Sequence, residues 1–268
     1  MIEQLITYAL LGAVAGILAG LFGIGGGLVI VPMLVLAFEW QGMDPNLIMK
    51  VALGTSLATI IFTSVSSTLA HNKRGAVLWK VVLGIAPGIL IGTFLGAYSA
   101  HWLPTKFLQI FFTAFLYYVA WTMFTGKKPP ASRTLPGNAG MFGAGNFIGL
   151  ISSWVGIGGG TLSVPFLLWC NTSIHAAIGT ASAIGFFIAV SGTLGYVLGG
   201  WGVVGVPGPS LGYISIPVML GIVCVSVLTA PLGAKLAHSL DTKKLKRIFA
   251  CLLIVVATRM LLKVAGIM

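Results

Sequence analysis

The residues in this chain whose types and spacing best suit a binding site are two runs of three glycines. The runs share the block Gly-x-Gly-Gly-Gly-x-x-x-Val-Pro and comprise Gly25, Gly26, Gly27, Gly158, Gly159 and Gly160. Each run lies inside an apolar stretch, where consecutive glycines are expected to break a helix. A helix that starts after such a break presents unpaired backbone N–H groups and the positive end of its dipole. Because helix starts of this kind bind oxyanions, we predict an anion site at the two runs.

Neutral hydroxyl groups close to the glycines are expected to add donors to this site. These groups belong to Thr55, Ser56, Thr161, Ser163, Thr180 and Ser182. Two simpler interpretations stay open. Glycines also let membrane helices approach one another closely, and a Ser or Thr inside a membrane helix often bonds its own backbone.

Charged side chains are scarce inside the apolar stretches. The four acidic residues all lie near expected helix ends or loops, namely Glu3, Glu39, Asp44 and Asp241. A cation site or proton relay built from carboxylates is therefore disfavoured. Arg259 is the one charged residue well inside an expected span, either as a counter-ion for an anionic substrate or with its head group extended toward the interface. His71 and His175 are expected on the surface.

The composition places the chain in a membrane. It is 57% hydrophobic and 7% charged, with a mean hydropathy of +1.05, whereas soluble domains carry about 25% charged residues. The net charge of +11 is assigned to topology and lipid head groups. The three cysteines suit neither a metal motif nor a disulfide set. We expect a small anionic substrate and membrane lipid as partners, with no nucleic acid, no cofactor and no metal, and the sequence leaves a homo-oligomer open.

The apolar stretches predict six crossing helices and two broken hairpins. Six runs have the roughly 20 residues that a crossing needs, at 47–70, 78–100, 105–125, 176–199, 213–237 and 245–266. Regions 5–38 and 139–170 each carry a glycine run near the middle. Each of these regions is expected to form a hairpin with one short arm or a re-entrant loop.

The basic residues predict how the chain sits in the membrane. They concentrate in loops 71–80, 126–138 and 235–247. The positive-inside rule puts these loops in the cytoplasm and both termini on the opposite side. Lys50 and Lys263 fit this arrangement less well.

The two halves of the sequence share several short blocks in the same order. Residues 52–58 parallel residues 177–183, and the basic loop 71–80 matches the uncharged loop 200–212. This reversal of loop charge indicates opposite orientations in the membrane, so the two helix starts would face each other near its centre. We predict an all-α polytopic membrane protein with two inverted-topology repeats, each a Gly-broken helical hairpin plus three transmembrane helices. The parts are repeat 1 at 1–125, a cytoplasmic linker at 126–138 and repeat 2 at 139–268.

The paired glycine blocks resemble those of the sulfite exporter TauE/SafE family, also called the 4-toluene sulfonate uptake permease family. The Ala-x-Gly-Thr blocks at 52–55 and 177–180 fit this family too, as does the short basic loop at 71–79. The resemblance covers nearly the whole chain. It implies transport, often export, of sulfite, sulfoacetate, sulfolactate or other organic anions.

The leading hypothesis is a secondary transporter of a small sulfur-containing anion in a bacterial-type cytoplasmic (inner) membrane, working by alternating access. The alternatives are transport of another small organic anion and a membrane accessory protein. An intramembrane enzyme is disfavoured, because neither His-Glu-x-x-His nor Gly-x-Ser-x-Gly occurs.

Overall fold

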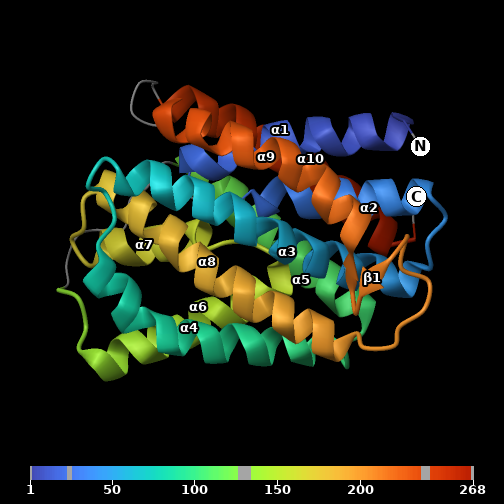
Figure 1. Cartoon of the computed structure of the whole chain (residues 1–268), viewed down its shortest axis with the longest axis horizontal. Helices are drawn as coiled ribbons and strands as arrows, with labels where there is room; N and C mark the ends of the chain where they lie inside the picture. Colours follow the sequence, from blue (N-terminus) through green and yellow to red (C-terminus); the bar gives the residue numbers. More distant parts are fainter. Residues whose placement is uncertain (1, 23–25, 126–133, 237–241, 267–268) are drawn as a thin grey trace.

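A computed structural model describes residues 2–22, 26–125, 134–236 and 242–266 (Figure 1). These residues are almost entirely helical, which confirms the predicted all-α class. In chain order the elements are α1 (Ile2–Phe22), α2 (Gly27–Trp40), α3 (Pro45–Asn72), α4 (Trp79–Ser99), α5 (Thr105–Thr125), α6 (Asn138–Val155), α7 (Gly160–Trp169), α8 (Ile174–Gly199), β1 (Ser210–Leu211), β2 (Ile214–Ser215), α9 (Ile216–Leu236) and α10 (Thr242–Val264).

Both predicted helix breaks are present, and glycine conformation explains them. Helix α6 ends at Gly156, which has a left-handed φ of 65°. Helix α2 begins after Gly26, whose φ is 82°. Glycine adopts a positive φ without the steric cost that a Cβ brings, so a non-glycine residue at either place would be strained. Gly25 lies outside the described residues.

Side-chain caps start the helix that follows each hairpin. Helix α3 starts with Pro45 after Asp44, whose Oδ1 accepts a hydrogen bond of 2.9 Å from the backbone N–H of Asn46. Helix α8 starts after Ser173, whose Oγ accepts one of 3.4 Å from the backbone N–H of Ala176. Such caps satisfy N–H groups that a helix start leaves unpaired, so both turns are locally encoded.

Five described helices are long and apolar enough to cross a membrane: α3, α4, α5, α8 and residues 216–233 of α9. These five match predicted spans. Helix α10, the sixth predicted span, has the length to cross, but it carries Arg247, Arg259 and Lys263 and is not among the five. The second arms of the two hairpins, α2 with 14 residues and α7 with 10, are shorter apolar helices, as predicted.

The two halves exchange packing partners. Helix α1 of the first half packs against α9 of the second, and the corresponding α6 packs against α4 of the first. Helices α3 and α8 pack on each other at the centre, and α5 packs on α10. In Figure 1, α1 and α6 start at opposite ends of the molecule. This reciprocal packing fits a two-fold relation between the halves, while their inverted orientation in a membrane stays a prediction.

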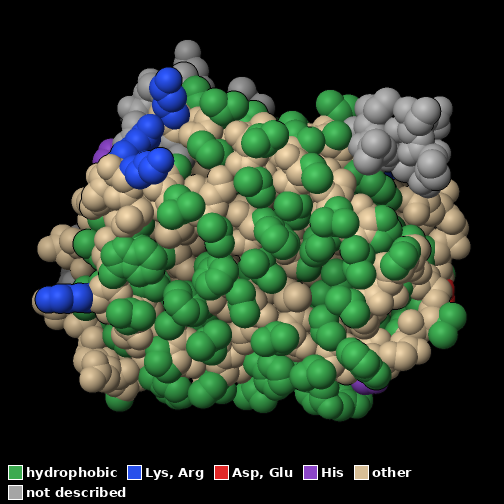
Figure 2. Space-filling model, viewed as in Figure 1, with side chains coloured by type: hydrophobic (Ala, Val, Ile, Leu, Met, Phe, Trp, Pro, Cys, Tyr) green, Lys and Arg blue, Asp and Glu red, His purple; other side chains and the backbone are tan. Residues whose placement is uncertain are grey.

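The expected basic loops and the chain termini lie at opposite ends of the molecule. In Figure 1 the turn between α3 and α4, the end of α5 and the end of α9 lie at the left, whereas both termini lie at the right. Lys and Arg side chains gather at the same left end in Figure 2. The arrangement agrees with a cytoplasmic left end under the positive-inside rule.

The two lysines that fitted the predicted topology poorly have local partners. Lys50 Nζ donates a hydrogen bond of 2.7 Å to the backbone oxygen of His101. Lys263 Nζ lies 2.7 Å from Glu39 Oε1 and forms an ion pair with it. Local interactions therefore satisfy both cations at the end of the molecule that carries the termini.

Candidate functional site

The two glycine breaks meet inside the protein. A Cβ placed on Gly27 would collide with the backbone oxygen of Gly156 and lie 2.8 Å from Ile157 Cα. Gly27 is therefore required for the backbone of the first break to reach the backbone of the second. The structure thus brings together two segments that the sequence identified separately as candidate anion sites.

The neighbouring glycines also sit against backbone. A Cβ on Gly26 would lie 2.9 Å from the backbone oxygen of Ala15, and one on Gly159 would lie 2.6 Å from that of Ala181. Gly160 is buried at the start of α7. These contacts support the simpler interpretation that the glycines allow close packing, and they are compatible with a binding role for the same backbone.

Thr55 and Thr180, both candidates for ligand contact, instead accept hydrogen bonds from backbone of the opposite half. The N–H of Ser215 donates to Thr55 Oγ1 at 3.1 Å, and the N–H of Leu78 donates to Thr180 Oγ1 at 3.0 Å. Leu78 caps α4, and Ser215 directly precedes the equivalent helix α9. Each threonine thus fixes the start of a helix in the other half.

Two further candidate hydroxyls have protein partners. Ser56 Oγ donates a hydrogen bond of 2.8 Å to the backbone oxygen of Gly156, inside the second break. Ser182 Oγ donates to the backbone oxygen of Ile178 at 3.1 Å and accepts from Ser67 Oγ at 3.2 Å. Ser56 is the candidate in this pair that directly touches a glycine break.

The remaining candidates lie at the start of α7 and have no hydrogen-bond partner. Thr161 Oγ1 and Ser163 Oγ are both buried and unpaired within the described structure. Ser152 Oγ, in the last turn of α6, is buried and unpaired as well. Ser152 is not among the residues predicted from the sequence, although the repeat aligns Ser152 with Ala19 and so marks a difference between the halves.

A side chain caps the end of the first hairpin helix in each half. His71 Nε2 donates to the backbone oxygen of Gly20 at 3.1 Å, and Tyr196 Oη donates to that of Ser153 at 3.0 Å. These carbonyls lie in last turns, where helix oxygens lack intrahelical partners. The expectation that His71 lies on the surface was wrong, since its side chain is only 1% exposed.

Arg259 is not brought to the glycine breaks by its main packing contacts. It is partly buried on α10, which packs mainly on α5. The adjacent Thr258 hydrogen-bonds through Oγ1 to Tyr117 Oη of α5 at 2.8 Å. The structure therefore places the predicted counter-ion on the α5–α10 pair.

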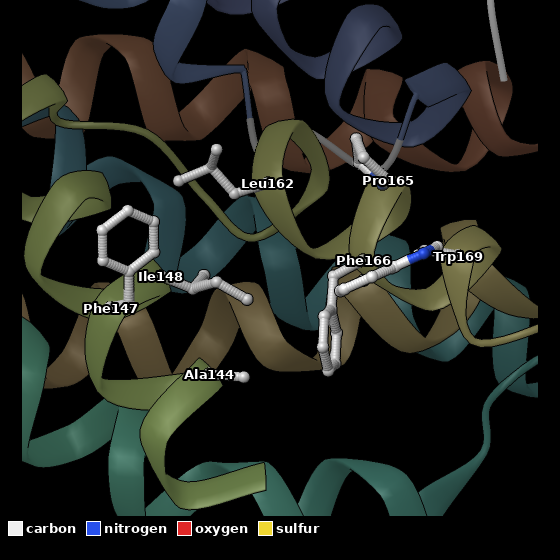
Figure 3. Close-up of a pocket in the computed structure, with 7 residues that line it drawn as sticks. All are labelled: Ala144, Phe147, Ile148, Leu162, Pro165, Phe166 and Trp169. Atoms are coloured by element: carbon white, nitrogen blue, oxygen red, sulfur yellow. The ribbon is translucent and has the colours of Figure 1, made fainter. Parts of the chain in front are cut away.

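The second hairpin opens an apolar cavity of about 350 Å³ between α6 and α7 (Figure 3). Its lining consists of Ala144, Phe147, Ile148, Leu162, Pro165, Phe166 and Trp169. On α7 these residues occupy the face opposite the buried Gly160 and Ser163, because residues three or four apart share one side of a helix. The cavity is therefore a separate feature from the face that carries Ser163.

The chemistry at the breaks relies on neutral groups. No cluster of three or more His, Cys, Asp or Glu side chains suited to a metal ion occurs in the part of the chain that the structure describes. The arrangement at the breaks can bind an anion through backbone N–H and hydroxyl groups.

Tyr213 lies in the loop before α9, and its hydroxyl shares a hydrogen bond of 3.0 Å with His101 Nδ1. Burial raises the pKa of the Tyr213 hydroxyl.

Comparison with known proteins identifies the family. The family described as Sulfite exporter TauE/SafE matches residues 8–260. A probable membrane transporter protein of Haemophilus influenzae is 39% identical over 98% of this chain and 100% of its own length. The probable membrane transporter protein YunE of Bacillus subtilis is 26% identical over 96% of this chain and 97% of its own. No solved structure matches. The chain belongs to the sulfite exporter TauE/SafE family and is a multi-pass transporter of the inner membrane, not an enzyme.

Proposed function

We propose that this protein exports a small sulfur-containing anion, such as sulfite or an organosulfonate like sulfoacetate, by alternating access. The contact between Gly27 and Gly156 carries the proposal, because it joins the two glycine breaks, the start of α2 and the end of α6, in the interior without a charged side chain. Family membership supports the same substrate class. The chain would take no cofactor, and lipid would surround its apolar helices.

The binding chemistry follows from the helix starts. Each start concentrates backbone N–H groups and roughly half a positive charge from the helix dipole. Hydroxyls can add donors without adding charge. A site of this kind binds a tetrahedral or pyramidal oxyanion and still releases it, because no full positive charge holds the anion in place.

The membrane potential can drive export. With the inside negative by about 100 mV, moving one negative charge outward is favoured by about 2.3 kcal/mol. Glu39 and Asp44 lie at the ends of α2 and α3 rather than inside a span. An inward proton gradient acting through a buried carboxylate is therefore not needed for the direction that we propose.

Flux in proteoliposomes tests this function. Purified protein is reconstituted, radiolabelled sulfite is loaded inside, and efflux is measured with and without an imposed inside-negative potential. We expect protein-dependent efflux that accelerates with the potential, and liposomes without protein give the background. Absence of protein-dependent flux for sulfite, sulfoacetate and sulfolactate would contradict the proposal.

Transport of another small organic anion is the second candidate, since neutral N–H and hydroxyl donors also bind carboxylates. Competition separates the two. Under the proposal, unlabelled sulfite or sulfoacetate slows labelled efflux at concentrations where acetate does not. Equal competition by acetate would favour a general organic-anion transporter. An accessory protein would show no flux of any anion.

A further inference from the structure

Matching positions of the two glycine breaks differ in polarity. The second break has Ser152, Thr161 and Ser163 where the first has Ala19, Leu28 and Ile30. We infer that the transported anion binds at the second break alone, at the start of α7, and that the first break is a packed scaffold. This inference rests on the proposed function and specifies where its site lies.

The three hydroxyls of the second break lack a protein partner. Ser152 and Ser163 are each 0% exposed, and their Oγ atoms, like Thr161 Oγ1, have no hydrogen-bond partner in the described structure. A buried hydroxyl without a partner costs free energy. Since helical Cα–Cβ bonds tilt toward the N-terminus, Ser163 leans toward the start of α7. Thr161 lies two positions earlier and projects from a different side of the helix. A bound oxyanion at the helix start would satisfy the Ser163 donor.

The residue packed beside the helix start also differs between the halves. In the first half, Cδ1 of Ile60 would lie 3.1 Å from a Cβ placed on Gly27, and Ile60 is fully buried there. The repeat places Gly185 at the position of Ile60. A Cβ on Gly185 would lie 3.2 Å from the backbone nitrogen of Gly159 and 3.9 Å from Gly158 Cα. The Ile60 side chain that packs on Gly27 is therefore replaced by glycine backbone against Gly159, with Ile184 Cγ2 at 3.1 Å from a Cβ placed there.

Helix α3 adds polar groups on the side of the second break. Ser56 Oγ donates to the backbone oxygen of Gly156 at 2.8 Å. Ser64 Cβ would lie 3.9 Å from a Cβ on Gly185. The repeat places Ala181 and Ala189 at the corresponding positions of α8. The polar surroundings and the replacement of Ile60 by a glycine thus coincide at one break.

Sulfite binding to purified protein tests the inference. Ser163→Ala and Gly185→Ala alter the second break, the latter by placing a methyl group against Gly159. Thr68→Ala removes an unpaired buried hydroxyl of α3, and Ile30→Val alters the first break. Dissociation constants are measured by calorimetry in detergent. We expect Ser163→Ala and Gly185→Ala to weaken sulfite binding at least about tenfold, as for a lost hydrogen bond to a charged group.

The control variants Thr68→Ala and Ile30→Val are expected to bind within about twofold of the unsubstituted protein, because neither removes a donor from the second break. Thermal unfolding verifies that each variant is folded, and Ser163→Ala retains the test if Gly185→Ala does not fold. Equal loss of sulfite affinity in variants of both breaks, or no loss of affinity in Ser163→Ala, would overturn the inference. Neither result would overturn the proposed transport function. Failure of the unsubstituted protein to bind or transport sulfite would overturn the proposed function itself.

Discussion

The first and second hairpins carry the same glycine block but occupy different surroundings. Most residues of α2 are buried, including Val29 and Pro32. The matching Leu162 and Pro165 of α7 line an open cavity, and few α7 residues are buried. The same motif therefore produces one closed hairpin and one open hairpin.

The difference suggests separate tasks for the two hairpins. Dense packing holds an element in place, whereas an element with few buried contacts moves at lower free-energy cost. Helix α2 is also tied at its end by the ion pair between Glu39 and Lys263. We infer that the first hairpin is the fixed element and that the second moves during transport.

The largest expected effect on transport comes from adding a side chain at the start of α2 or of α7, the second helices of the two hairpins. In Gly159→Val the new side chain meets the backbone oxygen of Ala181, and in Gly26→Val the φ of 82° adds strain. We expect both variants to lose transport while still inserting into the membrane, with packing strain of about 1–3 kcal/mol. Labelled sulfite flux and the amount of protein in membranes are compared.

Gly143→Val is the matched control, because a Cβ on Gly143 of α6 would meet no atom within 4 Å. It should transport normally. Normal transport by both Gly26→Val and Gly159→Val would mean that these glycines have no role beyond tolerable packing, and the distinction between the breaks would lose its basis.

A smaller effect is expected from the cap of α6. Tyr196→Phe removes the hydrogen bond to the Ser153 oxygen and should lower the free energy of unfolding by about 1 kcal/mol. Thermal unfolding in detergent measures the change. Tyr98→Phe, at a half-exposed tyrosine of α4, is the control. Equal stability of the two variants would show that this cap does not hold the second hairpin.

Filling the cavity should make the second hairpin resemble the first. Ala144→Leu introduces the residue type of the matching Leu11, which is buried in the first half. We expect a gain of about 0.5–1 kcal/mol in the free energy of unfolding from the buried methylenes, together with slower transport. Thermal unfolding and sulfite flux measure the two effects. A stabilised variant with unchanged flux would contradict movement of this hairpin.

The smallest effect is expected at Arg259, which lies on the α5–α10 pair outside both hairpins. Arg259→Gln should transport sulfite within about twofold of the unsubstituted protein, since a partly exposed charge contributes little at a distance. Flux is normalised to the protein recovered in membranes. A large loss of flux with normal membrane insertion would restore Arg259 as the counter-ion.

Local patterns in the sequence predicted much of the fold. The length of the apolar stretches predicted the helices, and the glycine blocks predicted the breaks at Gly26 and Gly156. The sequence also contains the caps Asp44 and Ser173 at the starts of α3 and α8. These features depend on neighbouring residues, so they can be recognised without the tertiary structure.

Contacts between the halves were beyond reach of the sequence alone. Thr55 and Thr180 resembled ligand donors, but they bond backbone of the opposite half. His71 lay at the edge of a span, and only tertiary packing brings it to the Gly20 oxygen. The repeat shows that Gly185 stands at the position of Ile60. Only the structure shows that Ile60 packs beside Gly27 and that Gly185 packs beside Gly159.

Locating a bound anion directly is the most decisive measurement. Selenite has the charge and pyramidal shape of sulfite, and its selenium atom scatters anomalously. In a crystal structure with selenite, we predict one anomalous peak at the start of α7, with selenite oxygens within hydrogen-bonding distance of Gly159 N and Ser163 Oγ. A peak beside Gly27 and Ile60, equal peaks at both breaks, or a peak at Arg259 would contradict the account.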